Sequence, residues 1–226
     1  TTVATNAVLT GNGAKVGLLT THGYESVLQV ARSFCPGGLG GWVSFVKGPL
    51  LAPLELTYGV KERTDASGDI SVKLDEGHLR EQLNLLKDKG EVEALTISFV
   101  NSYINDKNEI LAAKIAAEIF TDIPISISSE VIPEMQEYER AETTVLNSYV
   151  RPQVSNYVNN LQSNLEKKLG NDVQLSILRS DGGLASSRAT ADSPVNHLMS
   201  GPAGGVAGAV HFCNQAGYEN ILTFDM

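Results

Sequence analysis

The last quarter of the chain constrains its fold most strongly. Two apolar runs of strand length occur there, Leu175–Leu178 and Ile221–Phe224, and a glycine turn at Asp181–Gly183 follows the first. Between the runs, Ser200-Gly201-Pro202 suits the start of a helix, with serine as the cap and proline in the first turn. A strand, a helix and a strand in this order predict a unit of an α/β fold.

The helix that begins at Ser200 is unusual because Gly204, Gly205 and Gly208 interrupt it. Each glycine costs a helix up to about 1 kcal/mol relative to alanine. Two explanations account for this cost: close packing on a sheet, or close approach of a phosphate to the backbone. The chain has no GxGxxG or GxxxxGK[ST] motif, so the residues alone leave both explanations open.

The rest of the chain also alternates strand and helix patterns. A β-α-β-α-β run from residue 70 to 128, with amphipathic helices at Glu76–Lys89 and Ile110–Phe120, favours parallel strands joined by crossover helices. We therefore predict a doubly wound α/β core. Its expected strands are Val16–Thr20, Val92–Val100, Ile123–Ser128, Val173–Arg179 and Ile221–Phe224.

Other local patterns predict the connecting elements. Capping chemistry is expected at Asp106–Glu109, an ion pair at Glu62-Arg63, and a solvated acidic helix face around Glu139. The remaining expected elements are helices over Thr1–Leu9, Thr20–Phe34 and from Glu142 onward, strands over Leu54–Val60 and Ile70–Leu74, and a hairpin turn at Thr64–Gly68.

Several polar residues stand where ligands bind in open α/β sheets. His22 and Asn101 each follow a predicted strand, at the carboxyl edge of the sheet. Arg140 could bind a carboxylate or phosphate, and the hydroxyls of Thr1 and Thr2 could donate to an anion. Each residue also has a structural alternative. His22 could be a hydrogen-bonded loop histidine and Asn101 a turn residue. Arg140 could form an internal ion pair, and the two threonines could cap a helix.

Composition excludes some classes of partner. The chain has 226 residues, 42% of them hydrophobic, and a net charge of −9, which argues against nucleic acid or an anionic membrane. The sequence has no apolar run of transmembrane length and no signal-peptide pattern. Cys35 and Cys213 are far apart, which favours reduced thiols and a cytoplasmic location.

Several blocks together resemble the hydantoinase A/5-oxoprolinase family. They occur in family order and span nearly the whole chain. The blocks are TTVATNAVL, LLTTHGYESVLQVAR, VKERTDASG, SFVNSY, EYERAETTVLNSYVRP, RSDGGL and SGPAGGVAGA followed by NILTFDM.

This resemblance implies an actin-like (ribonuclease H-like) ATPase lobe, related to actin, hexokinase and heat-shock chaperones. It further implies ATP and Mg²⁺ as cofactors. A phosphate loop would begin at Asp225, which would face the metal through water, and Ser200, Gly201, Gly204 and Gly205 would lie near the phosphates. The Gly-Gly-Thr expected after Met226 is missing, so we expect the chain to be an internal fragment that is inactive by itself. Residues 1–128 would end the family's N-terminal domain and residues 129–226 would start its ATPase-like domain.

The resemblance implies an ATP-dependent hydrolase of a cyclic amide, such as a hydantoin or 5-oxoproline, working with a hydantoinase B-like subunit or domain. Two alternatives stay open at this point: a subunit of an ATP-dependent ketone carboxylase, and a non-catalytic scaffold that binds a partner. Catalytic residues cannot be assigned from the residues present.

Overall fold

The computed structural model describes residues 2–33, 37–38, 40–41, 47–170 and 172–224. The chain divides into two compact units, one of residues 14–149 and the other of residues 1–13 with 150–226. We describe each unit by itself. The predicted family-domain boundary at residue 128 differs from this division and stays a prediction.

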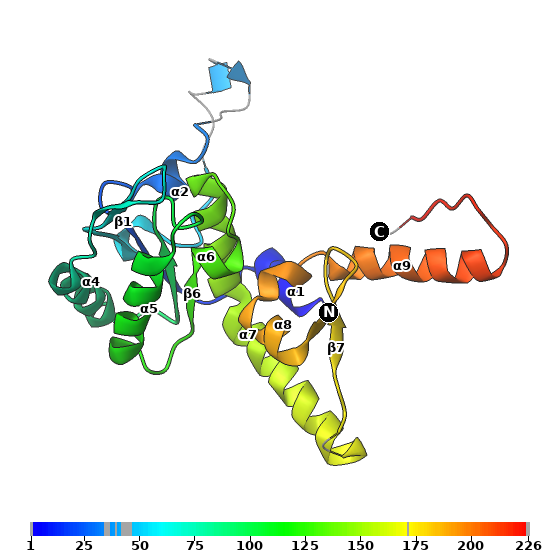
Figure 1. Cartoon of the computed structure of the whole chain (residues 1–226). Coiled ribbons are helices and arrows are strands. Elements are labelled where there is room, and N and C mark those ends of the chain that lie inside the picture. Colours follow the sequence, from blue (N-terminus) through cyan, green and yellow to red (C-terminus); the bar gives the residue numbers. More distant parts are fainter. Residues whose placement is uncertain (1, 34–36, 39, 42–46, 171, 225–226) are drawn as a thin grey trace. The chain divides into compact units, whose positions relative to one another are not determined.

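The larger unit is built on a four-stranded parallel sheet, with strand order β2-β1-β5-β6 (Figure 1). Its strands are β1 (Val16–Thr21), β2 (Thr57–Val60), β5 (Ala94–Ser98) and β6 (Ile125–Ile127). Parallel strands need crossover connections, and helices α4 (Glu76–Asp88) and α5 (Lys107–Ile119) provide two of them. The predicted α/β class and parallel pairing are confirmed.

Helices α4 and α5 cover one face of the sheet with apolar side chains. Leu79, Leu83 and Leu86, the stripe of α4, are fully buried against Leu95 and Ile97 of β5. Asp75 caps the helix, since its side chain accepts a hydrogen bond from the backbone N–H of His78 at 2.9 Å. The 3.6-residue spacing of these leucines thus places one face of α4 in the core.

The first part of α7 (Glu137–Leu169) covers the other face of the sheet through polar contacts. Side chains of successive strand residues point to opposite faces of the sheet, so Thr96 points to the face away from Leu95 and Ile97. Its hydroxyl donates to Ser148 Oγ at 2.7 Å, and Asn147 Nδ2 donates to Ser126 Oγ at 3.2 Å. The sheet is therefore covered on both faces, as parallel sheets normally are.

Two connecting regions of this unit test local predictions. The turn at residues 64–68 is confirmed: β3 (Arg63–Thr64) pairs antiparallel with β4 (Ile70–Val72), and Gly68 adopts a φ of 91°. The helix expected over residues 20–34 is wrong, because Thr20 and Thr21 stay in β1 and the helix α2 is only Val27–Val30. A short 3₁₀ turn, η1 (Leu54–Leu56), replaces the start of the expected strand before β2.

The smaller unit packs around the second part of α7. Val150, Val154 and Val158 recur at four-residue spacing and are fully buried. Around them lie α1 (Val3–Thr10), β7 (Ser176–Leu178), β8 (Leu184–Ser186), α8 (Ser187–Asp192), the 3₁₀ helix η2 (Pro194–His197) and α9 (Ser200–Gln215). Arg151 pairs with Asp192 at 2.9 Å and joins α7 to α8.

Two strands predicted for the doubly wound core are wrong. The run at residues 173–179 gives only β7, which pairs antiparallel with β8 in a separate two-stranded sheet. The run at residues 221–224 has no strand assignment, and Leu222 and Phe224 are 96% and 83% exposed. An extended run forms a strand only when a neighbour accepts its backbone hydrogen bonds, and none of the described residues pairs with it.

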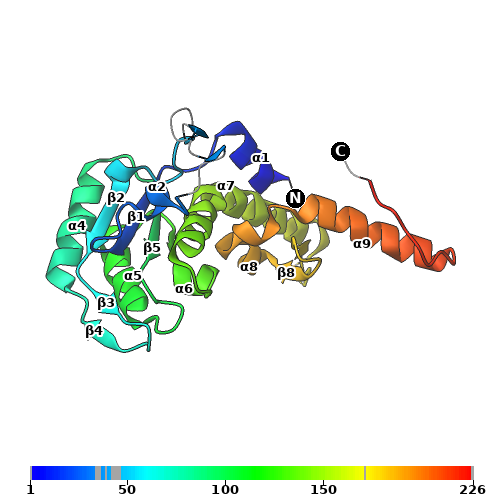
Figure 2. The ribbon, with the colours of Figure 1, turned by 90° about the horizontal axis from the view of Figure 1, so that it is seen from above.

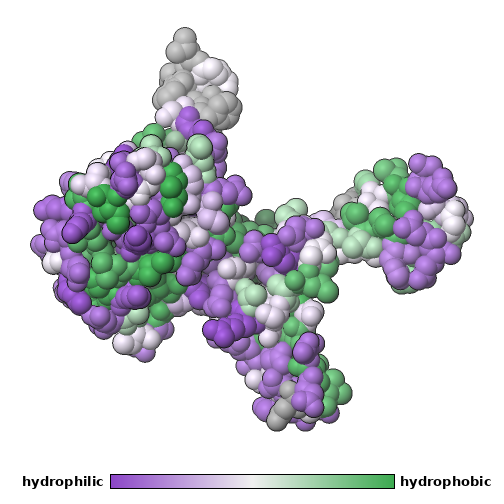
Figure 3. Space-filling view, viewed as in Figure 1, coloured by the Kyte–Doolittle hydropathy of each residue, from purple (hydrophilic) through white to green (hydrophobic). Residues whose placement is uncertain are grey.

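Apolar side chains of α9 are exposed as well. Figure 3 shows them among polar ones, and they include Val206, Val210 and Phe212. Within the described ranges, no helix is both long enough and apolar enough to cross a bilayer. Cys213 carries a free thiol, whereas Cys35 lies outside the described residues.

Candidate functional site

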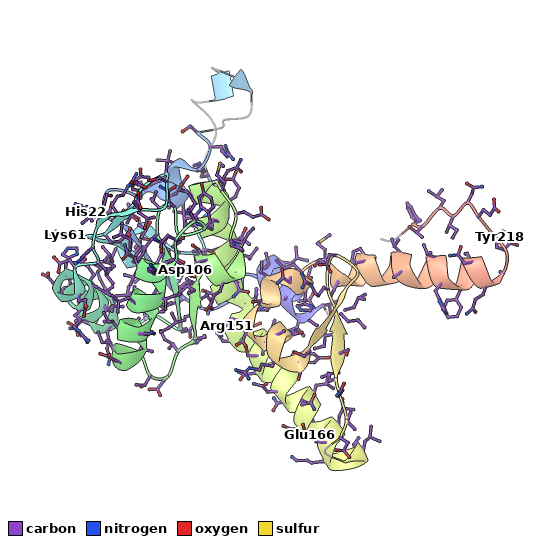
Figure 4. All side chains as sticks on the ribbon, viewed as in Figure 1. His22, Lys61, Asp106, Arg151, Glu166 and Tyr218 are labelled. Carbon is purple, nitrogen blue, oxygen red and sulfur yellow. The ribbon has the colours of Figure 1, made fainter. Side chains whose placement is uncertain are left out.

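The carboxyl edge of the parallel sheet places several predicted residues in one region. His22 directly follows β1, and its backbone N–H donates to the carbonyl of Val60, the last residue of β2, at 2.8 Å. Its Nδ1 lies 3.2 Å from Glu25 Oε1. Figure 4 labels His22 and Lys61 at this edge. The imidazole is mostly exposed, so it can meet a ligand here.

Glycine at position 59 makes room for this pair. A Cβ built there would lie 1.9 Å from Glu25 Oε1 and 2.9 Å from the Cα of His22. Any side chain at this position would therefore displace the carboxylate that orients the histidine. No local sequence pattern predicts this contact, because Gly59 and Glu25 come from different segments of the chain.

A buried carboxyl group, Glu62, ties three strand ends together. The Thr21 hydroxyl donates to its Oε1, Asn108 Nδ2 donates to its Oε2 at 2.8 Å, and the N–H of Val100 donates to Thr21 Oγ1 at 2.9 Å. Burial raises the pKa of Glu62 above its usual value. The predicted ion pair between Glu62 and Arg63 is not a close contact: the Arg63 guanidinium lies over the Tyr24 ring, and its charge acts on Glu62 at longer range.

A second buried carboxyl group, Glu109, anchors Arg140. Glu109 accepts hydrogen bonds from the N–H of Phe99 at 2.7 Å and from Ser128 Oγ at 2.6 Å. Arg140 donates to Ser128 Oγ, to the carbonyl of Phe99 at 2.9 Å and to the carbonyl of Glu134 at 3.0 Å. Burial lowers the pKa of Arg140. Protein groups thus occupy this guanidinium, which favours a positioning role over direct contact with substrate.

The capping box expected at residues 106–109 is also wrong, because the Glu109 side chain bonds to the buried network instead of the helix start. Asp106 makes no side-chain capping bond, and the Glu109 side chain points into the polar network. Only the tertiary structure brings Ser128 and Phe99 to this helix.

Asn101 lies at the same edge in a left-handed conformation, with φ of 60°. Its Nδ2 donates to the carbonyl of Thr64 at 3.0 Å, so the side chain fixes the β3–β4 hairpin. Non-glycine residues with positive φ are uncommon, and asparagine is among those that tolerate this conformation. The contact fits the structural alternative for Asn101, and a site role stays a prediction.

The start of α9 forms a second region, in the smaller unit. Ser200 is buried in the first turn, although the capping position is Met199, whose N–H donates to Ser180 Oγ at 2.9 Å. A Cβ at Gly204 would lie 2.9 Å from Leu178 Cδ2, so this glycine allows α9 to pack on β7.

The other glycines of α9 have no such neighbour. Apart from the backbone of α9 itself and the adjacent residues, a Cβ at Gly201, Gly205 or Gly208 would meet no heavy atom of the described chain within 4 Å. Packing therefore explains one glycine, while these three leave the backbone open to a ligand. In the first turn of α9, Pro202 has no N–H, and the N–H of Ala203 donates to the carbonyl of Met199 at 3.2 Å. The positive end of the helix dipole still attracts anions to this helix start.

The start of α1 lies beside the start of α9 in both ribbon views (Figure 1, Figure 2). The Thr5 hydroxyl donates to the carbonyl of Leu198, which fixes this approach. Thr2 precedes α1 and makes no side-chain capping bond. A site role for Thr2 stays a prediction.

Two predicted site residues, Thr1 and Asp225, lie outside the described residues. Among those that are described, no group of three or more histidine, cysteine or carboxylate side chains could hold a metal ion. The metal role expected for Asp225 therefore stays a prediction.

The parallel sheet with helices on both faces defines an α/β module. Two solved structures share it: the ATP-dependent caprolactamase from Pseudomonas jessenii, with TM-score 0.86 and 31% identity over 100% of this chain, and an acetone carboxylase that carries out ATP-dependent acetone carboxylation, with TM-score 0.85 and 28% identity over 97%. Each match covers 32% of the other chain.

Residues 1–120 match the hydantoinase/oxoprolinase N-terminal region and residues 140–226 match hydantoinase/oxoprolinase. The chain belongs to the hydantoinase/oxoprolinase family. The gamma subunit of acetophenone carboxylase from Aromatoleum aromaticum is 30% identical over the whole chain and 32% of its own length. An uncharacterized protein of Methanocaldococcus jannaschii is 33% identical over the whole chain and 33% of its own length. The chain thus spans about a third of these relatives.

Proposed function

We propose that the protein to which this chain belongs is an ATP-dependent hydrolase of a cyclic amide. The observation that carries this proposal is the start of α9, where Gly201 and Gly205 leave the helix backbone open while Gly204 packs on Leu178. An open helix start is suited to phosphate, since a side chain there would keep the anion away from the N–H groups. Caprolactamase and 5-oxoprolinases are among the relatives, which supports a cyclic amide as the substrate.

The chain's own residues would position the ATP phosphates and stabilise their charge, and would not react covalently. When bound, ATP would supply a phosphoryl group that activates the amide oxygen before the ring opens. Ser200, Gly201, Gly204 and Gly205 would line the phosphates, with Asp225 ordering Mg²⁺ through water. Stabilising charge with fixed dipoles is the main contribution of proteins to such transfers.

At the sheet edge, the pair of His22 with Glu25 is the described group best placed to exchange a proton with a ligand. Its separation of 3.2 Å lets the carboxylate orient the ring. Asn101 and Arg140 would support this edge through their backbone contacts, and Thr1 and Thr2 would add hydroxyl donors beside α9.

A ketone carboxylase subunit is the second candidate. The match to acetone carboxylase is nearly as good as the match to caprolactamase, with TM-scores of 0.85 and 0.86. Hydrolysis of a cyclic amide and carboxylation of a ketone both need an activated substrate oxygen, so activation by ATP fits either reaction. Relatives named as alpha, beta and gamma subunits support a partner subunit of the hydantoinase B type. The cytoplasmic location stays a prediction.

The test is turnover by the intact protein, co-expressed with its neighbouring subunit. Phosphate release from ATP is measured with a panel of hydantoin, 5-oxoproline and lactams, and separately with ketones plus bicarbonate. Amide-dependent release with ring-opened product supports the hydrolase, and ketone-dependent release supports the carboxylase. ATP binding without release in either panel would support the scaffold and refute the proposal.

A further inference from the structure

The gap between β1 and β5 is the topological switch point of the parallel sheet. From β1 the chain crosses to β2 on one side, whereas from β5 it continues through α5 to β6 on the other side. Because these two connections leave in opposite directions, a crevice opens outside the carboxyl ends of the two strands. Ligands of open α/β sheets bind in such crevices, so the topology marks this gap as a candidate site.

The crevice at this point is a cavity of about 10 Å³, which is roughly the room for one water-sized group. Thr20 at the end of β1 and Ser98 at the end of β5 line it, and these two residues are register partners in the sheet. Arg140 and Ala141 of α7 line the side that faces them. Both strands at the switch point therefore contribute a hydroxyl-bearing residue to one small space.

A larger hollow of about 420 Å³ adjoins the crevice, because Tyr24, Val27 and Glu137 line both spaces. Its volume falls in the range of small-molecule sites. Val30 adds apolar surface and Tyr138 adds aromatic surface. The hollow can thus hold the apolar body of a small molecule while one atom of that molecule enters the crevice.

The hydroxyl groups of Thr20 and Ser98 have no role in holding the fold together. The two residues are only 3% and 4% exposed, yet neither hydroxyl has a hydrogen-bond partner within the described ranges. Neither oxygen is among the sealed side-chain atoms without a partner, which include Ser129 Oγ, so a ligand atom can reach both. Thr96 differs, since its hydroxyl donates to Ser148 Oγ at 2.7 Å. Buried hydroxyls normally have partners, and two unused donors at one small space point to an acceptor from outside the chain.

The charges around both spaces favour a neutral acceptor. The carboxylates of Glu109 and Glu137 both act on the charge of Arg140, and Glu137 itself lines the crevice. In the hollow, Arg32 Nε donates to Glu139 Oε1 at 2.6 Å, so Glu139, which was expected to be solvated, has a partner from a distant segment. A carboxylate ligand would therefore meet Glu137 without an unbalanced cation among the described lining residues, whereas a carbonyl oxygen needs none.

We propose that the crevice binds the carbonyl oxygen of a small neutral molecule, with the hydroxyls of Thr20 and Ser98 donating to it. The ring or chain of the molecule would lie in the hollow, against Tyr24, Val27 and Val30. Cyclic amides and ketones both have this chemistry. Choosing these two classes rests on the proposed function, whereas the requirement for a carbonyl oxygen rests on the crevice. The site lies within the larger unit and is separate from the α9 region proposed for the phosphates.

The experiment measures binding to the 226-residue chain without ATP, by ligand-observed NMR. The probes are δ-valerolactam and cyclohexanone, which carry the carbonyl, tetrahydropyran, a ring of the same size without it, and cyclohexanecarboxylate, an anion. We expect saturable binding of the carbonyl probes and about fivefold or more weaker binding of tetrahydropyran, since a net hydrogen bond is worth about that much. Binding of the lactam alone or the ketone alone also supports the site and assigns it to that class.

Variants test the two hydroxyls. Thr20→Val and Ser98→Ala should each weaken binding of the carbonyl probes about fivefold. Because neither hydroxyl bonds to a described residue, both variants should unfold at the same urea concentration as the wild type. Thr96→Val is the matched control: its hydroxyl lies on the same face of β5 but bonds to Ser148, so this variant should lose stability and keep binding.

Several results would overturn the proposal. They are no saturable binding of either carbonyl probe, equal binding of tetrahydropyran, tighter binding of the carboxylate, or unchanged binding in both hydroxyl variants; the crevice would then hold an ordered water only. A loss of stability in Thr20→Val and Ser98→Ala as large as in Thr96→Val would show that the hydroxyls serve the fold instead. Because ATP is absent, failure of turnover in the intact protein would refute the proposed function without touching this result.

Discussion

Replacing Gly205 with alanine separates the two explanations for the glycines of α9. Apart from the backbone of α9 itself and the adjacent residues, the added Cβ meets no heavy atom of the described chain within 4 Å, so no packing contact opposes it. Alanine is better than glycine in a helix by about 0.8–1.0 kcal/mol. For a chain of this size, that gain corresponds to a rise in melting temperature of about 2–4 °C.

The same change should impair function if a phosphate approaches the backbone at this position. We expect ATP-dependent turnover of the intact protein to fall at least about tenfold, a loss of roughly 1.4 kcal/mol in transition-state stabilisation. Thermal unfolding of the 226-residue chain and phosphate release by the intact protein measure the two effects. A variant that is both more stable and less active would show that the glycine is kept for a ligand.

Two neighbouring glycines provide matched controls. Gly208→Ala also meets open space but lies nearly one turn further along α9, so it should gain stability and keep turnover. Gly204→Ala would bring its Cβ to 2.9 Å from Leu178 Cδ2, so the leucine side chain must shift and the variant should gain less stability than Gly208→Ala. If Gly205→Ala raises stability and leaves turnover unchanged, the phosphate explanation is refuted.

Three further substitutions test the carboxylates and the buried arginine. Burial raises the pKa of Glu62 above 4.5, so the native state binds the proton of this carboxyl group more tightly than the unfolded chain does. The free energy of unfolding therefore falls as pH rises above 4.5 and the group loses its proton. Urea unfolding at pH 4.5 and pH 7 should therefore show a smaller decline for Glu62→Gln than for the wild type, and an equal decline would contradict the burial argument. Arg140→Met should cost about 3 kcal/mol of unfolding free energy by leaving Glu109 without its cationic neighbour, whereas a loss below about 1 kcal/mol would argue that Arg140 serves a ligand instead. Asp225→Asn in the intact protein should cut ATP-dependent turnover at least about tenfold with little change in folding, and unchanged turnover and Mg²⁺ dependence would make Asp225 structural.

The sequence determined those features that depend on neighbours along the chain. The spacing of Leu79, Leu83 and Leu86 predicted helix α4 and its buried face, because a helix brings such residues together without help from other segments. The turn around Gly68 and the strand β5 were predicted on the same local grounds. The family was also evident, since its blocks recur in order.

Only the tertiary structure decided which segments pair and which polar groups meet. The run at residues 221–224 has the same local pattern as β1, yet it forms no strand among the described residues because no backbone neighbour completes it. Glu109 suited a helix cap by its position, but Ser128 and Phe99 draw its side chain inward. Hydrogen bonds between distant segments leave no periodicity in the sequence, so the partners of Glu62, Glu109 and Glu139 appear only once the chain has folded.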